Sequence, residues 1–190
     1  NAASAVCQGE ILQTQRRFDL TLTRDEYFHM IESKTGALFA VSTELGARLS
    51  GASKKIQKEL HDFGMKVGTA YQIYDDCVDL IGKEEKAGQT LGTDLTKGKL
   101  TLPVLNLIAS GTKTQREKLN ERLLLKEPID VNTLVGIADY DGAIQRAVLT
   151  GKEILSQAKE HLVDLSNSSY QKGLLQITNY LETLFDDCKC

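Results

Sequence analysis

Three aspartates fall within five positions of the stretch YQIYDDCVDL, residues 71–80, at spacings that suit one face of a helix. A helix of 3.6 residues per turn stacks Asp75 on Asp79 and places Asp76 beside them. Crowded carboxylates repel one another and are costly to bury, so a positive charge must offset them or the helix must meet water. Mg²⁺ prefers oxygen ligands and commonly uses one or two carboxylates plus substrate phosphates. We therefore predict that Asp75, Asp76 and Asp79 bind Mg²⁺, with a solvated acidic face as the alternative.

Two lysines lie in segments that suit an anion. Lys34 adjoins a hydroxyl and a glycine in KTG, and Lys99 comes just before an expected helix whose free N–H groups favour negative charge. Gln72 extends the acidic stripe by one turn, and Gly68 leaves room for another group to approach the backbone there. Each lysine alone is more often a surface residue. Together with the aspartates, the two lysines indicate a diphosphate held by metal on one side and ammonium on the other.

A long central helix must carry this stripe. Apolar residues wrap most of the circumference of Lys54–Ile81, which is typical of a helix buried on nearly all sides. Thr23 and Glu26 form the pattern of a capping box, so another helix is expected to begin at Arg24. That helix continues to Gly51, with a break near Lys34.

The remaining elements are also predicted to be helical, because no run of residues alternates with period 2. Residues 82–99 are rich in glycine and charge and are predicted to be a mobile loop. Pro103 fits the first turn of a short buried helix. The other expected helices run from near residue 1 to Phe18, over 114–125, 131–138 and 142–165, and from Tyr170 to Phe185.

Composition is that of one globular domain of 190 residues, with 41% hydrophobic and 26% charged residues. The net charge of −3 provides no basic field, so nucleic acid is not an expected partner. No stretch approaches the ~20 apolar residues of a membrane span. The four cysteines match no zinc or redox spacing and are expected to be reduced thiols of a cytoplasmic protein. Because the sequence starts without methionine and already with helical periodicity, we expect further sequence before residue 1.

Two segments together resemble a known family. FGMKVGTAYQIYDDCVDLIG, residues 63–82, and GTDLTKGKLTLPVLNL, residues 92–107, are similar to the second aspartate-rich region of trans-isoprenyl (polyprenyl) diphosphate synthases. KTGALF, residues 34–39, resembles the family's KT segment, and GEILQ, residues 9–13, resembles a helix facing its cavity. The resemblance implies an all-α fold of long antiparallel helices around a deep central cavity. Residues 1–190 would be a single domain, the C-terminal part of a larger polyprenyl synthetase domain that forms a homodimer.

The same resemblance implies a reaction and assigns roles. The reaction is the head-to-tail condensation of isopentenyl diphosphate with an allylic prenyl diphosphate, in which metal and lysine stabilise the departing charge. Asp75, Lys34 and Lys99 would be catalytic, and all three aspartates would bind the Mg²⁺ that bridges the allylic diphosphate. The residues expected to contact or surround that diphosphate are Lys34, Thr35, Gln72 and Lys99.

Two departures from the family pattern limit what the chain is expected to do. The earlier aspartate-rich motif is absent, since the only other pair of adjacent aspartates is Asp186–Asp187. We expect that motif before residue 1 or in a separate chain, and therefore expect this chain alone not to catalyse. Gln89 stands where the family usually has lysine, although Lys83 or Lys86 could reach instead. A non-catalytic prenyl-diphosphate-binding subunit is thus an alternative, whereas GTDLTKGKLTLP argues against a third class, the class I terpene cyclases.

Overall fold

The computed structural model describes residues 1–81, 92–125, 134, 139–163, 165 and 168–188. Within these residues the regular structure is entirely helical, as predicted. The elements are α1 (Ala2–Gln15), α2 (Arg24–Ile31), the π-helix η1 (Glu32–Gly36), α3 (Ala37–Leu49), α4 (Lys54–Ile81), α6 (Thr93–Thr96), α7 (Leu102–Ser110), α8 (Lys113–Leu124), α10 (Tyr140–Glu160) and α11 (Ser169–Asp186).

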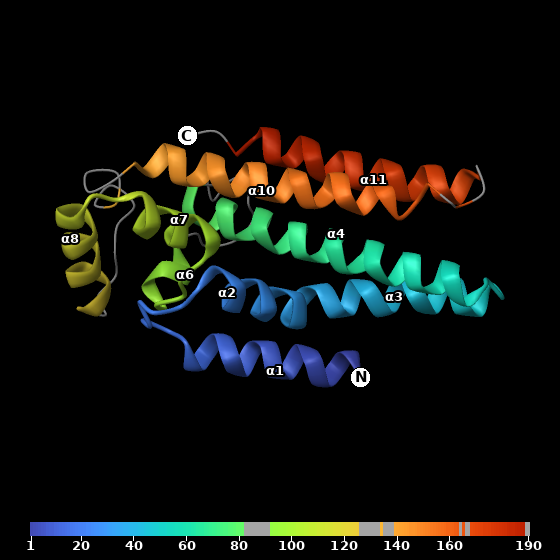
Figure 1. Ribbon diagram of the computed structural model, residues 1–190, viewed down its shortest axis with the longest axis horizontal. Coiled ribbons are helices and arrows are strands. Elements are labelled where there is room, and N and C mark those ends of the chain that lie inside the picture. The colour runs from blue at the N-terminus through green and yellow to red at the C-terminus, as the bar shows by residue number, and fades with distance from the viewer. Residues whose placement is uncertain (82–91, 126–133, 135–138, 164, 166–167, 189–190) are drawn as a thin grey trace.

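The long helices lie side by side and alternate in direction along the chain (Figure 1). α4 is the middle helix, with α2, η1 and α3 along one side and α10 and α11 along the other. α1 covers the outer side of η1 and α2. The short helices α6, α7 and α8 gather at the end of the bundle where α4 ends, so the C-terminal turns of α4 face them.

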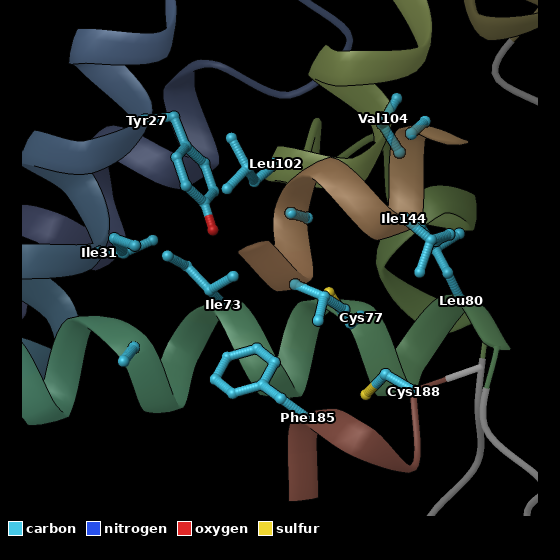
Figure 2. Packing of buried hydrophobic residues seen from close by; sticks show 14 of the residues in the cluster. Tyr27, Ile31, Ile73, Cys77, Leu80, Leu102, Val104, Ile144, Phe185 and Cys188 are labelled. Carbon is cyan, nitrogen blue, oxygen red and sulfur yellow. The ribbon is translucent and has the colours of Figure 1, made fainter. Parts of the chain in front are cut away.

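The core is built around α4, whose predicted bounds the structure confirms. Ile73 and Cys77 of α4 are completely buried among side chains from the neighbouring helices, including Tyr27, Leu102 and Phe185 (Figure 2). Burying one large apolar side chain stabilises a fold by roughly 1.5–3 kcal/mol relative to leaving it exposed. Much of the C-terminal half of α4 is buried in this way, and its polar stripe lies between these apolar surfaces.

α3 and η1 approach α4 closely because two glycines of α4 face them. A Cβ atom at Gly64 would lie 2.5 Å from the carbonyl oxygen of Phe39, and one at Gly68 would lie 2.9 Å from the Cα of Gly36. The space predicted at Gly68 is therefore filled by the backbone and side chain of the neighbouring helical segment. The close contact fixes η1, and with it Lys34, against the polar stripe of α4.

The segment from Arg24 to Leu49 is continuous and contains a π-helical turn. The predicted capping box is confirmed: the Thr23 hydroxyl accepts from Glu26 N–H, and the Glu26 carboxylate accepts from Thr23 N–H. The break predicted near Lys34 is instead the π-helix Glu32–Gly36, which accommodates one extra residue in the turn. Such turns occur frequently at functional sites.

Two other predictions differ from the structure, at places where the chain makes tertiary contacts. The first helix ends at Gln15 and not at Phe18, whose φ of 59° turns the chain. The Phe18 N–H donates to the carbonyl of Gly98 at 2.8 Å. Residues 92–99, predicted as loop, contain the helical turn α6.

The later helices follow the predicted order. Pro103 lies in the first turn of α7, α8 begins at a Thr112–Gln115 capping box, and α10 begins two residues earlier and ends before its predicted limit. The predictions for Lys83, Lys86 and Gln89, and for residues 131–138 apart from Leu134, lie outside the described residues. No helix within the described ranges combines the length and apolar character needed to span a bilayer.

Candidate functional site

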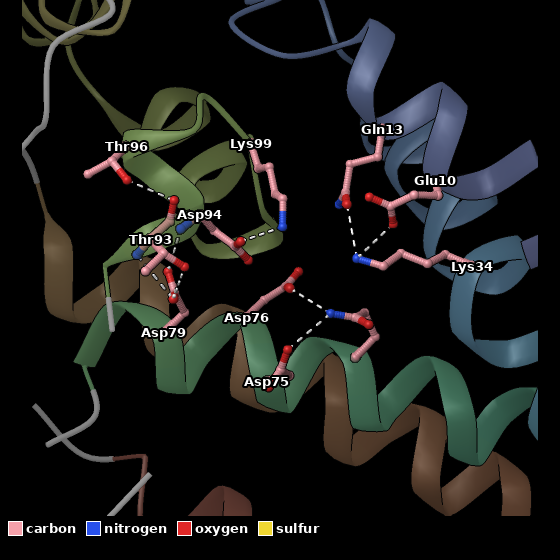
Figure 3. A network of polar contacts seen from close by, with 11 residues as sticks. Glu10, Gln13, Lys34, Asp75, Asp76, Asp79, Thr93, Asp94, Thr96 and Lys99 are labelled. Carbon is pink, nitrogen blue, oxygen red and sulfur yellow. Dashed lines mark hydrogen bonds and ion pairs between the residues drawn. The ribbon is translucent and has the colours of Figure 1, made fainter. Parts of the chain in front are cut away.

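A polar pocket of about 170 Å³ lies over the C-terminal half of α4, between η1 and the α6 segment. It brings together five of the residues predicted from sequence, because η1 and the α6 segment reach the stripe from different sides (Figure 3). Its charged side chains, among the residues that the structure describes, are three lysines and three aspartates. The lining residues are Lys34, Gln72, Asp75, Asp79, Thr93, Asp94, Lys97 and Lys99.

Asp75 faces this pocket with few competing partners. Its side chain is half-buried, and the Gln72 amide nitrogen at 3.4 Å is its one hydrogen-bond donor within the described part of the chain. The Thr35 hydroxyl donates to the Gln72 carbonyl oxygen at 2.7 Å, which turns the amide nitrogen toward the aspartates. Thr35 therefore acts on the site through Gln72 and does not line the pocket.

Asp76 is buried beneath the pocket, on the side of α4 that packs against α2. Its carboxylate accepts a 2.6 Å hydrogen bond from the Tyr27 hydroxyl and a 3.0 Å hydrogen bond from the Gln72 amide. Burial raises the pKa of Asp76 to about 7, with the neighbouring carboxylates of Asp94 and Asp75 adding to the rise and the two hydrogen bonds opposing it. Asp76 is thus held by protein groups and is not in the pocket lining.

Asp79 anchors the α6 segment. Its carboxylate accepts from the backbone N–H of Asp94 at 3.1 Å and of Thr93 at 3.3 Å, and from the Thr93 hydroxyl at 3.4 Å. Burial raises the pKa of Asp79, an effect that these hydrogen bonds oppose. The carboxylate lines the pocket, but its oxygens already satisfy the first N–H groups of α6.

The two predicted lysines approach the pocket from opposite elements (Figure 3). Lys34 donates to the Gln13 side chain at 3.0 Å, and its ammonium lies 3.4 Å from the Glu10 carboxylate. The Lys99 ammonium lies 2.5 Å from the carboxylate of Asp94. Gln13 and Glu10, from the GEILQ segment, thus contact Lys34, although neither of them lines the pocket.

Sequence reasoning missed several of these groups. Thr93, Asp94 and Lys97 had a readable signal, because they lie between glycines of positive φ, Gly92 at 69° and Gly98 at 74°, next to Lys99. Tyr27 had none, since an apolar helix position does not reveal that its hydroxyl meets Asp76.

The carboxylates of the pocket suit a metal ion that is coordinated partly by the protein and partly by a bound phosphate group. No three His, Cys, Asp or Glu side chains within the described ranges are grouped closely enough to enclose a cation by themselves. One pocket-facing carboxylate is nevertheless sufficient for Mg²⁺, which keeps several waters and takes phosphate oxygens. Of the predicted triplet, Asp75 fits that requirement best.

A larger hollow of about 560 Å³ lies on another side of α4, between α2–η1 and α10. Both of its basic side chains are bonded to protein partners, Lys66 to Gln157 at 2.9 Å and His161 to Glu59 at 2.8 Å. The larger volume alone therefore does not identify this hollow as the functional site. The smaller pocket is the one in which several lysines and aspartates lie close together.

Comparison with known proteins identifies a family that matches most of the chain. The family described as Polyprenyl synthetase matches residues 1–139. A short chain isoprenyl diphosphate synthase of Methanothermobacter thermautotrophicus is 31% identical over 182 residues, covering 93% of this chain and 54% of that protein. Heptaprenyl diphosphate synthase component 2 of Bacillus subtilis is 33% identical over 176 residues, covering 93% and 50%.

Solved structures show the same architecture. A polyprenyl synthase from Caulobacter crescentus, crystallised with calcium and isoprenyl diphosphate, superposes with a TM-score of 0.87 at 27% identity. The match covers 96% of this chain and 56% of that one. The chain thus spans about half the length of the proteins that it matches.

Proposed function

Because the chain belongs to the polyprenyl synthetase family, we propose that it forms the diphosphate-binding part of a prenyltransferase that condenses isopentenyl diphosphate with an allylic prenyl diphosphate. The observation that carries this proposal is the pocket in which Asp75 of α4 meets lysines from η1 and the α6 segment. Anions need cationic partners, and a carboxylate beside those lysines is useful to an anion only through a bridging cation.

Each side chain then has a role in holding the allylic diphosphate. Asp75 would hold Mg²⁺, with Asp79 at the edge of the same pocket and the buried Asp76 as the third member of the stripe. Lys34 and Lys99 would bind diphosphate oxygens as they give up contacts with Gln13, Glu10 and Asp94. When bound, Mg²⁺ would stabilise negative charge on the leaving diphosphate.

The remaining residues orient this set. Gln72, fixed by Thr35, donates toward Asp75 and Asp76 and so defines the rotamers of the stripe. Asp79 holds α6 in place, which positions Lys99. Groups oriented before the ligand arrives need little reorganisation when charge develops on the diphosphate.

Binding of a prenyl diphosphate tests this proposal directly. Titration calorimetry would compare geranyl diphosphate with and without Mg²⁺, for the chain and for Asp75→Ala. The expected result is Mg²⁺-dependent binding that Asp75→Ala weakens at least tenfold. Asp141→Ala, which removes an exposed carboxylate at the start of α10, is the matched control and should bind normally. Equal binding by Asp75→Ala and the chain would refute the metal role.

Catalysis by the whole protein is a further proposal, since the chain spans only about half the length of its relatives. We propose that the isolated chain does not complete prenyl transfer and needs the other half of the domain, within the same polypeptide or on a separate chain. A non-catalytic binding subunit is the second candidate, favoured by the neutral Gln89. A prenyl-transfer assay with the isolated chain should give no product, and ordinary turnover would contradict this view.

Two expectations from the sequence also stand as proposals, a homodimeric assembly and a cytoplasmic location. Sedimentation of the purified protein would measure the first. Fractionation of cells that produce it would measure the second.

A further inference from the structure

We propose that Lys97 is an additional binding residue for the diphosphate and supplies the readily available ammonium group of the pocket. This inference rests on the proposed function, because it takes the diphosphate as the ligand. Lys97 was not among the residues singled out by their sequence pattern. Three observations support it, namely the position of Lys97 in the pocket, its exposure, and the absence of an ion-pair partner for it among the described residues.

The three lysines of the pocket differ in their partners. Lys34 contacts Gln13 and Glu10, and Lys99 is paired with Asp94 at 2.5 Å. Lys97 is exposed and has no ion-pair partner among the residues that the structure describes. A diphosphate must compete with an internal carboxylate for Lys34 and for Lys99, but it meets no such competitor at Lys97 in this part of the chain.

The backbone that carries Lys97 is fixed on both sides. Lys97 is the C-terminal cap of α6, and its N–H donates within that turn, whose beginning is held by Asp79. The next residue, Gly98, adopts a φ of 74° and accepts a hydrogen bond from Phe18 N–H at 2.8 Å. A Cβ atom at Gly98 would lie 2.4 Å from the Phe18 ring, so only glycine allows this contact. The long side chain of Lys97 therefore extends from a defined point on the pocket wall.

Charge balance explains why a third lysine matters. The formal charges of the lining residues that the structure describes sum to zero, three lysines against three aspartates. Mg²⁺ at Asp75 would leave the pocket positive, which suits an anion with several negative charges. Because Lys97 has no ion-pair partner within the described part of the chain, its removal should reduce the attraction for the diphosphate.

Inorganic pyrophosphate is the probe for the test, because it contains the proposed contact group without a prenyl chain. Calorimetry in Mg²⁺ would compare the chain with Lys97→Gln, Lys97→Arg and Lys118→Gln. Lys118 is an exposed lysine of α8 and serves as the control for loss of one positive charge. The expected result is about five- to tenfold weaker binding for Lys97→Gln, near-normal binding for Lys97→Arg and no change for Lys118→Gln.

The outcomes separate this inference from the proposed function. If the chain binds Mg²⁺–pyrophosphate and Asp75→Ala weakens it, but Lys97→Gln binds like Lys118→Gln, the role of Lys97 is overturned and the proposed function stands. If the chain itself does not bind, both are overturned. Thermal melting of Lys97→Gln in EDTA should match that of the unsubstituted chain, which shows that weaker binding does not come from misfolding.

Discussion

The Tyr27 hydroxyl donates a 2.6 Å hydrogen bond to the buried carboxylate of Asp76, and this contact joins α2 to α4 across 49 positions of sequence. Both side chains are almost completely inaccessible to solvent. Asp76 is next in sequence to Asp75, the residue that we propose as the metal ligand, and both carboxylates accept from the Gln72 amide. The geometry of the pocket therefore depends on a polar bond inside the core.

Replacing Tyr27 with phenylalanine should destabilise the protein by about 1–3 kcal/mol, because the change leaves a buried carboxylate with one donor fewer. Urea unfolding followed by circular dichroism would measure this loss. Tyr180→Phe, at an exposed position of α11, is the control and should change the unfolding free energy very little. The loss should be smaller when Tyr27→Phe is made together with Asp76→Asn, since the carboxylate is then absent. Equal losses in the two backgrounds would show that the hydroxyl and the carboxylate are not coupled.

In metal-free buffer, Asp76 should make folding stability decrease as the pH rises from about 4 to 7. Burial raises its pKa to about 7 from the ordinary value of 3.8, so the folded state holds a proton that the unfolded state has lost. The stability from this proton is complete below the unfolded pKa and disappears as the pH rises through the folded pKa, by at most about 1.4 kcal/mol per pH unit.

Asp76→Asn isolates this contribution, because asparagine is nearly the same shape and cannot ionise. Urea unfolding in EDTA at several pH values would compare the two proteins. We expect the variant to gain stability relative to the unsubstituted chain between pH 5 and 8. A constant difference across that range would contradict the raised pKa.

Asp75 and Asp79 should respond differently to substitution, although they are one helical turn apart. Asp79→Ala removes the acceptor of the first N–H groups of α6 and should cost about 1 kcal/mol in EDTA. Asp75→Asn removes a carboxylate that faces the pocket and should leave stability in EDTA nearly unchanged. Mg²⁺ and pyrophosphate together should raise the melting temperature of the unsubstituted chain but not that of Asp75→Asn. Thermal unfolding with and without both ligands would measure this. A gain of the same size in Asp75→Asn would remove Asp75 as the ligand.

Gly64→Ala, which adds one methyl group to α4, should loosen the contact between α3 and α4. Its Cβ would lie 2.3 Å from the Thr43 hydroxyl and 2.5 Å from a backbone oxygen, so the helices must separate, at a cost of about 1–3 kcal/mol. Gly46→Ala on α3 meets nothing within 4 Å and should stabilise the helix by about 0.5–1 kcal/mol. Chemical denaturation of both variants would measure these opposite changes. Destabilisation of similar size at both positions would exclude close packing as the cause.

Local patterns were enough to predict the helices that carry the site. The bounds of α4 follow from the distribution of apolar residues around one helix, and the start of α2 follows from the Thr23–Glu26 capping box. Both signals lie within a few residues of the structure that they determine. The clustering of Lys34, Gln72, Asp75 and Lys99 was also predicted, because the spacing on α4 and the lysine segments suggested one shared ligand.

The partners of Asp76 and Asp79 could not be predicted in the same way. Which carboxylate faces the pocket depends on how α2 and α6 pack against α4, and no local pattern encodes that packing. α6 is only four residues long, and Asp79, from a different helix, satisfies its first N–H groups. Its local sequence therefore predicts a loop, and only the tertiary contact explains the helical turn.

The π-helical turn at Glu32–Gly36 determines which changes in chain length the family fold can accept here. One residue more or less in a helix rotates everything beyond it by about 100°. The π-helical turn absorbs such an extra residue, so deletion of one residue between Glu32 and Gly36 should leave a regular α-helical turn and keep Phe39 against the glycines of α4. Related proteins should therefore be able to lose one residue within this turn, as they can in connecting loops, without changing the contact between α3 and α4.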